Sequence, residues 1–480
     1  MHYSIRACAG IAHALKAHAR VMGVVVERRL FVRDRADWEE RVERYGWLTD
    51  EPASAIECPN AVLLPLQLIE RSARYSDGVY RGGVCSSDFQ FIAGRKRNVD
   101  KRANFDCDES YEVPAAAIVD RDERVVFGGI IDDHFGHMLL DVSCRLWYLV
   151  QNPDFEKVVF LRYPNERPEG FDALVLLDLM GVPRSKVEVI DRPTRFKSVI
   201  VPDETSAVLS GIRREFAMPF ERIRERTAPG DARKLYLTRT SFEKHDIVGE
   251  EFFEEFYRRR GFQVVSPETL PIEQQVSLVA GADEIVTTLG TMSHLILFAK
   301  PTAKVTVFVR WACQPAQLLI DKATGIEPYY VDAFSNPLPV RHNEGPFLML
   351  PNHYFREYLE EVGDAFDEGE LSVGENLPQM VFEFLQKWGA AYSDEETINR
   401  LDVFSMFDVV DGVDRLFAEN GLATGSVQRQ MIGYLNKSVD ALKAENKALK
   451  SELKRMKSSK SWKATKPLRE VGQKLRGNGR

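Results

Sequence analysis

Hydrophobic and polar residues alternate with two different periods along the middle of the chain. Short apolar runs predict buried strands, and amphipathic stretches that end at a glycine predict helices between them. The expected strands are 158–161, 187–190, 199–201, 234–238, 262–265, 285–288 and 305–309. The expected helices are 171–180, 250–260, 272–280 and 290–298. This alternation, with short connections, indicates an α/β protein with a doubly wound parallel sheet, which binds ligands at the carboxyl ends of its strands.

The C-terminal part of the chain has a different pattern. Residues 346–425 look mostly helical and acidic, and a heptad repeat follows them. Its two core positions hold Ile432, Val439, Asn446 and Leu453, and Leu435, Leu442, Leu449 and Met456. A single Asn among apolar core residues favours a parallel two-stranded coiled coil, so we expect a homodimer. The alternative is one amphipathic helix packed on its own domain.

Composition indicates a globular protein. Of the 480 residues, 44% are hydrophobic and 28% are charged, which suits two or three domains. No apolar run reaches about 18 residues, and no clear cleavage site follows the N-terminal apolar segment, so we expect neither a membrane span nor a signal peptide. The six cysteines are scattered without a C-x-x-C pair, which indicates reduced thiols and a cytoplasmic protein.

The charge is unevenly distributed along the chain. Residues 454–480 hold ten Lys or Arg and one acid, a net charge of +9, which leaves −17 for the rest of a chain whose total is −8. We expect this basic tail to bind an anionic membrane surface, with Trp462 and Leu468 at the interface, so that the protein is peripheral at the inner membrane. Nucleic acid is the competing partner, but an acidic body repels a polyanion and the tail has one aromatic residue, so we expect none.

One segment concentrates ionisable side chains. Three Asp and two His lie within ten residues, at Asp132, Asp133, His134, His137 and Asp141. On a helix His137 and Asp141 share a face, and a carboxylate beside an imidazole orients it and raises its basicity. We therefore predict that His137 is a general base, oriented by Asp141 or Asp133. The alternatives are structural histidines or metal ligands, but no third ligand has a suitable spacing.

Two later segments carry groups that suit an anion. Thr238, Arg239 and Thr240 follow one expected strand, and Gly290, Thr291, Ser293 and His294 open the helix after another. Arg and hydroxyl groups donate to phosphate, and a helix N-terminus attracts anions. Because both segments follow strands of one sheet, we expect them to share an edge that holds a diphosphate leaving group without a metal. A surface arginine and an ordinary Ser/Thr cap are the alternatives.

In this order, the three segments resemble glycosyltransferase family 61. That family carries N-N-Y-G-H-F-L-L-E/D followed by R-L-W, and residues 134–141 and 145–147 are similar to it. Its later motifs L-x-R, G-F-x-V-x-x-P-E, E-Q and G-S-S-L-H-N-x-x-F are similar to residues 237–239, 261–268, 273–275 and 290–298. The resemblance covers roughly residues 115–310. Residues 459–469 are also similar to the tails of many bacterial polysaccharide glycosyltransferases.

The resemblance implies a GT-B type fold with two Rossmann-like domains. The first would be an acceptor-side α/β domain, residues 1–205, and the second a nucleotide-sugar-binding domain, residues 206–345. A helical region, residues 346–425, and the coiled coil with its basic tail, residues 426–480, would follow.

The resemblance also implies an inverting glycosyltransferase with no metal or other cofactor. It would transfer a hexose or pentose from a nucleotide-sugar donor to a growing capsular or other surface polysaccharide, or to a lipid-linked acceptor. The expected donor-binding residues are Thr238, Arg239, Glu268, Gln275, Gly290, Thr291, Ser293 and His294. His134 and Leu295 stand where the family has Asn. If those Asn side chains contact the donor or acceptor, the two differences imply an altered specificity or, at worst, an inactive relative. The alternatives are a non-catalytic nucleotide- or glycan-binding scaffold and a phosphate-linked sugar transferase.

Overall fold

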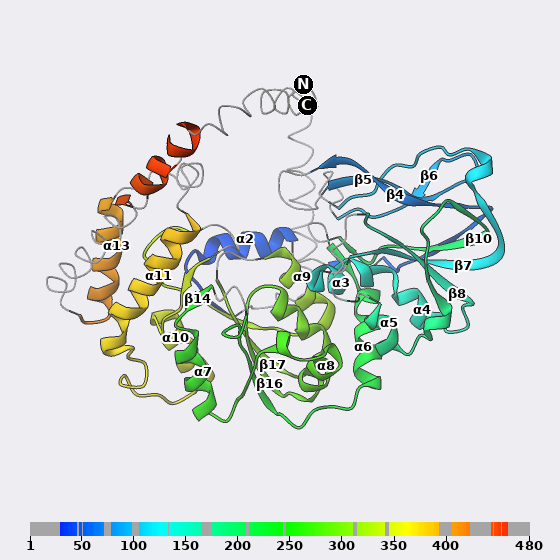
Figure 1. Ribbon diagram of the computed structural model, residues 1–480. Coiled ribbons are helices and arrows are strands. Elements are labelled where there is room, and N and C mark those ends of the chain that lie inside the picture. The colour runs from blue at the N-terminus through cyan, green and yellow to red at the C-terminus, as the bar shows by residue number, and fades with distance from the viewer. Residues whose placement is uncertain are drawn as a thin grey trace, which may run out of the picture. The chain divides into compact units, whose positions relative to one another are not determined.

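The computed structural model in Figure 1 describes most of the chain between residues 29 and 458. The described residues are 29–45, 48–49, 51–71, 78–97, 105–132, 134–164, 172, 174–207, 211–242, 246–310, 314–340, 345–392, 406–422, 443–444, 446–452 and 454–458. The chain forms two compact units. One consists of Met1–Asn336 and Val340–Val373, and the other of Pro337–Pro339 and Gly374–Arg480.

The first unit contains a fully parallel sheet, here called the parallel sheet. Its order is β1 (Arg29–Phe31), β18 (Tyr329–Val331), β17 (Lys304–Phe308), β16 (Glu284–Thr288), β13 (Lys234–Leu237) and β15 (Gln263–Val265). The chain runs from β13 to the edge at β15 and then crosses back to β16. The strand order therefore reverses between β13 and β16, which is the point where open α/β sheets bind ligands.

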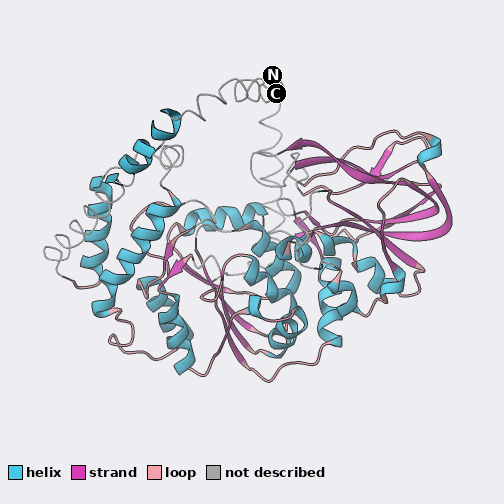
Figure 2. Ribbon diagram, in the orientation of Figure 1, coloured by secondary structure: helices cyan, strands magenta, loops and turns pink. Residues whose placement is uncertain are grey.

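Helices cover both faces of the parallel sheet (Figures 1 and 2). On one face lie α7 (Glu250–Arg259) and α10 (His353–Val362), where the ring of Phe253 packs edge-on against Phe308 and Phe355. On the other lie α8 (Ile272–Gly281) and α9 (Pro315–Thr324), together with the 3-10 helix η6 (Thr291–Phe298) that contacts both. The doubly wound parallel sheet expected from residues 234–310 is confirmed.

The helix after β16 differs from its prediction. The sequence analysis expected an α-helix over 290–298, but η6 has 3-10 geometry and begins at Thr291, after Gly290. Residues 292–298 are all buried, and all of them are apolar except Ser293 and His294. The run therefore has no amphipathic period that distinguishes the two kinds of helix.

The second large sheet of the first unit is mixed, and we call it the mixed sheet. Its order is β6 (Phe91–Ala93), β5 (Gly78–Cys85), β4 (Val62–Arg71), β10 (Thr194–Pro202), β7 (Val119–Ile131), β8 (Lys157–Arg162) and β9 (Val187–Val189), with β3 (Ala55–Pro59) also paired to β10. The strands from β10 to β9 run parallel, as in a Rossmann-like fold, whereas β3 to β6 add antiparallel pairs.

Helices after β7 and β8 cover one face of the mixed sheet. They are α3 (Phe135–Leu140), α4 (Trp147–Gln151) and α5 (Val175–Met180). Then α6 (Met218–Arg226) contacts α4, α5 and η6, and one buried hydrophobic cluster extends from Val126 and Phe160 of the mixed sheet to Leu235 and Ile285 of the parallel sheet. The two sheets therefore share a core within the first unit.

Apart from one helix of 11 residues, the remaining elements are short. They are α2 (Arg35–Tyr45), β2 (Leu48–Thr49), η1 (Ala115–Ala117), η2 (Val142–Arg145), η3 (Arg184–Lys186), β11 (Ser206–Ala207), β12 (Gly211–Arg213), η4 (Arg214–Ala217), β14 (Ile247–Val248), η5 (Pro267–Thr269), β19 (Phe347–Leu348) and η7 (Gly374–Asn376). The N-terminal strand β1 pairs with β18 in the parallel sheet, although the sequence analysis assigned its residues to the first domain. The pairing of two strands that lie far apart along the chain produces no pattern in the residues near either strand, so the sequence did not predict it.

The second unit contains α11 (Leu377–Ala391) and α13 (Met406–Glu419). The Trp388 indole donates to the carbonyl of Pro339 within this unit. Of the predicted coiled coil, the structure describes 443–444, 446–452 and 454–458, all helical, and the other heptad residues and the tail from 459 lie outside the described residues. The coiled coil remains a prediction. None of the described helices has the length and apolar character to cross a membrane.

Candidate active site

The predicted pair His137 and Asp141 is in contact. His137 lies on α3 and Asp141 directly follows that helix, and His137 Nδ1 is 2.6 Å from Asp141 Oδ2. The carboxylate side chain is 9% exposed and the imidazole is 22% exposed, so the ring is anchored on its buried side. When the Nδ1–H of a neutral imidazole donates to a carboxylate, Nε2 is left as the proton acceptor.

Asp141 is fixed from its other side by arginines that the sequence analysis did not identify. Arg95 Nη2 donates to Asp141 Oδ1, and Arg97 Nε lies 3.5 Å from Oδ2. Burial disfavours the charged carboxylate, but the charges of Arg95 and Arg97 and the His137 hydrogen bond outweigh it and hold the pKa of Asp141 well below its usual range. Asp141 therefore stays ionised and orients the imidazole. We call the set of His137, Asp141, Arg95, Arg97 and His134 the His137 cluster.

Further groups surround the imidazole of His137. The Phe105 and His134 rings lie 5.1 and 4.9 Å from it, centroid to centroid. Asp132, at the end of β7, accepts a hydrogen bond from the backbone of His134, and burial raises the pKa of its carboxyl. Asp132 is thus a second group that can accept a proton here. Asp133, the other predicted orienting residue, lies outside the described residues.

Two arginines meet at the carboxyl edge of the parallel sheet. Arg239 follows β13 and Arg310 follows β17, and their guanidinium groups lie 3.8 and 3.7 Å from the two oxygens of Asp246. Arg310 Nε also donates to the carbonyl of Leu289 at 2.8 Å. Glu250, at the start of α7, accepts from the backbone N–H of Arg239. We call Arg239, Arg310, Asp246 and Glu250 the Arg239 cluster, which lies where the strand order of the parallel sheet reverses. Arg310 was not predicted, although it also directly follows an expected strand.

The turn after β16 brings the two sheets together. Gly290 has a φ of +143°, and a Cβ there would lie 2.6 Å from Arg310 Nη2, so a side chain at this position would be strained and would displace that guanidinium. Thr291 Oγ1 would lie 3.1 Å from a Cβ on Gly136 of α3. His294 is buried, and burial, followed by the charges of His137 and His134, lowers its pKa to about 4. His294 is therefore neutral at pH 7 and lies near the His137 cluster.

Three of the other predicted donor-binding residues are held by hydrogen bonds to protein groups. Thr238 Oγ1 donates to Glu254 at 2.6 Å, and Gln275 Nε2 donates to the carbonyl of Leu270 at 2.9 Å. Ser293 Oγ lies 2.5 Å from Gln317 Oε1 and 2.7 Å from the Gly290 carbonyl, so it shapes the turn. Glu268 is exposed in η5, and among the described residues no hydrogen bond or ion pair joins it to either cluster. Of the predicted set, Arg239, Gly290, Thr291 and His294 come nearest to the clusters.

The chain has two D-x-D triplets, residues 106–108 and 120–122, and paired carboxylates are a common way to bind a metal ion. Asp106 is buried and accepts from the backbone N–H of Arg97, and Asp120 and Asp122 lie within β7, where they pair with Arg195 and Lys197. Within the described ranges, no group of three His, Cys, Asp or Glu side chains is arranged to hold a metal ion. Metal independence remains a prediction.

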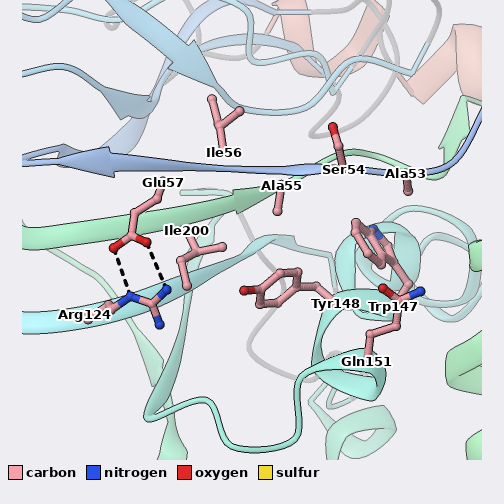
Figure 3. A pocket seen from close by; sticks show the side chains of 10 residues that line it. All are labelled: Ala53, Ser54, Ala55, Ile56, Glu57, Arg124, Trp147, Tyr148, Gln151 and Ile200. Atoms are coloured by element: carbon pink, nitrogen blue, oxygen red, sulfur yellow. Dashed lines mark hydrogen bonds and ion pairs between the residues drawn. The ribbon is translucent and has the colours of Figure 1, made fainter.

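A separate pocket of about 310 Å³ lies on the mixed sheet (Figure 3). Tyr148 and Trp147 of α4 form one side, and Glu57 and Arg124 lie at its far end, paired by two hydrogen bonds. None of its lining residues belongs to either cluster, and its charged groups already satisfy each other. The predicted site residues that the structure describes lie outside this pocket.

Comparison with known proteins gives a family match for the middle of the chain. The family model for glycosyltransferase 61 matches residues 135–306. The matched span includes His137, Asp141, Arg239 and the whole of η6, and it ends before Arg310. It supports a glycosyltransferase. No curated protein matches the chain.

Proposed function

We propose that this protein is an inverting glycosyltransferase that moves a sugar from a nucleotide-sugar donor to an acceptor hydroxyl. The observation that carries the proposal is the contact between α3 and the start of η6, because it brings an anchored histidine close to the arginine edge of the parallel sheet. A base on one side of a sugar and an anion site on the other are what inverting transfer requires.

In this reaction His137 Nε2 accepts the proton of the acceptor hydroxyl. The acceptor oxygen forms a bond to the anomeric carbon from the face opposite the donor phosphate, and the bond from that carbon to the diphosphate oxygen breaks. The bonding electrons leave with the nucleoside diphosphate. Asp141 stabilises the imidazolium that forms, because its carboxylate stays ionised and in contact with Nδ1–H.

The donor diphosphate binds at the Arg239 cluster in this proposal. Arg239 supplies charge and paired N–H donors, and Thr291 supplies a hydroxyl at the first position of η6. No cofactor is required, because the arginines stabilise the negative charge that develops on the leaving group. The matching arrangement is GT-B, with the parallel sheet on the donor side and the mixed sheet on the acceptor side.

The proposed acceptor is a growing surface polysaccharide, such as a capsule, or a lipid-linked glycan at the inner membrane. The basic tail supports this location, because each basic residue near an anionic surface contributes on the order of 1 kcal/mol. Leu449 and Met456, two residues of the predicted coiled-coil seam, are 58% and 47% exposed, which supports pairing with a second chain.

The test is release of nucleoside diphosphate from a panel of nucleotide sugars, with and without short glycan acceptors. The proposal expects release that depends on one donor and one acceptor, and a product of inverted anomeric configuration. Tight nucleotide binding without release in any pairing would instead favour a non-catalytic scaffold.

A further inference from the structure

The Arg239 cluster holds two arginines, and among the residues that the structure describes a single carboxylate, that of Asp246, lies between their guanidinium groups. We propose that Arg310 is a second phosphate-binding residue of this site, and that Asp246 competes with the donor diphosphate for both arginines. This inference rests on the proposed function for the identity of the donor, but its anion chemistry can be tested without sugar transfer.

Arg310 is held so that its terminal nitrogens face the site. Its Nε donates to the Leu289 carbonyl, and its guanidinium lies 5.3 Å from the centre of the Phe347 ring. Gly290 leaves the space that Arg310 Nη2 occupies. A guanidinium anchored through Nε presents its Nη edge, which is the edge that binds phosphate in a bidentate manner.

Asp246 cannot saturate these nitrogens from its position. Its backbone carbonyl accepts from Phe347 N at 2.7 Å, beside the β14–β19 pair, so the residue is fixed. Its oxygens lie 3.8 Å from Arg239 and 3.7 Å from Arg310, beyond the range of about 2.7–2.9 Å for a charged hydrogen bond. In addition, the buried Arg239 Nε has no hydrogen-bond partner among the described residues. A phosphate oxygen between the arginines can make the short bonds that Asp246 does not.

The charges of the cluster also favour an anion. Burial, followed by the charge of Arg239, lowers the pKa of Arg310 to about 10, so Arg310 remains charged at pH 7 beside the guanidinium of Arg239. Burial raises the pKa of Glu250 to about 8, so this carboxyl is mainly neutral at pH 7 and does not compensate them. Two positive charges then face one negative charge, and a diphosphate supplies the missing negative charge.

The experiment measures binding of inorganic pyrophosphate to the full-length protein by calorimetry. The variants are Arg310→Ala, Arg310→Lys and Asp246→Asn, and Arg258→Ala is the matched control because Arg258 is an exposed arginine near the far end of α7. We expect at least tenfold weaker binding for Arg310→Ala, an intermediate loss for Arg310→Lys, no change for Arg258→Ala, and at least threefold tighter binding for Asp246→Asn.

Asp246→Asn keeps the test decisive if Arg310→Ala fails to fold, because a misfolded protein cannot gain affinity. Wild-type affinity in a folded Arg310→Ala or Arg310→Lys protein would overturn the role of Arg310. Unchanged or weaker binding by Asp246→Asn would overturn the competition. If the affinities change as expected but no nucleotide sugar is turned over, the anion site stands and the proposed function fails.

Discussion

The His137 cluster and the Arg239 cluster each place two arginines around one aspartate, yet they balance charge differently. At Asp141 the Arg95 guanidinium donates a direct hydrogen bond, and Glu204 adds a second carboxylate 3.2 Å from Arg95. At Asp246 both arginines stay beyond hydrogen-bond distance, and Glu250 is mainly neutral at pH 7. The first cluster therefore pairs its two arginines with two ionisable carboxylates, whereas the second leaves one positive charge uncompensated, which in the proposed function binds an anion.

The largest expected effect is on turnover, and it follows from removing the imidazole of the His137 cluster. His137→Ala removes the proton acceptor and should lower turnover by about two to four orders of magnitude, the usual range for a lost acid–base group. Steady-state kinetics with the donor identified by the panel measures this, and His353→Ala, an exposed histidine of α10, is the control. Turnover near that of the wild type would make His137 structural and leave Asp132 as the next base to test.

Asp141→Asn should affect stability, because it leaves the buried Arg95 without its closest carboxylate. Breaking a buried ion pair costs about 3–5 kcal/mol of unfolding free energy. Since the pKa of Asp141 is depressed in the folded state, its contribution is complete above the unfolded value of about 3.9 and is lost as pH falls below it. Denaturant unfolding should show a difference between wild type and variant at pH 6 that narrows toward pH 3. A constant difference would contradict the assignment.

Glu250→Gln should change stability less than Asp141→Asn does, and it should stabilise the protein instead of destabilising it. The pKa of Glu250 in the folded protein, about 8, lies above its ordinary value of 4.5. The wild type therefore loses stability as pH rises between these two values, whereas the variant has no carboxyl group to ionise at this position. The melting temperature of Glu250→Gln should therefore rise relative to the wild type between pH 5 and pH 8. Its exposed neighbour gives the control variant Glu251→Gln, which should follow the wild type, and parallel profiles for all three proteins would show that Glu250 titrates normally.

Removing the C-terminal part should leave both clusters unchanged. Truncation after Gly425 should give a monomer that turns over a soluble acceptor at the wild-type rate and no longer binds anionic liposomes. Light scattering and liposome sedimentation at low salt measure the two properties. A truncated protein that stays dimeric would contradict the coiled coil, and full-length protein that ignores the liposomes would contradict the membrane role of the tail.

The sequence predicted what depends on local pattern. The alternation of strands and helices after residue 234 gave the parallel sheet, and the spacing of four gave the contact between His137 and Asp141. The sequence did not predict the arginines that complete each cluster. Arg95 lies 46 residues before Asp141, and only the pairing of distant strands brings them together. Arg310 had a usable signal, since the rule that selected Arg239, an arginine just after a strand, applies equally to it.

The most direct test of the separate roles of the two clusters is a titration of nucleoside diphosphate into two variants. Each variant should lose turnover, but for a different reason. Calorimetry should show that His137→Ala binds the nucleoside diphosphate of the active donor with wild-type affinity. Arg239→Ala should bind it roughly ten to a hundred times more weakly, as expected for lost hydrogen bonds to a charged group. Equal affinities for Arg239→Ala and the wild type, or a comparable loss in His137→Ala, would contradict the account in which one cluster moves the proton and the other holds the diphosphate.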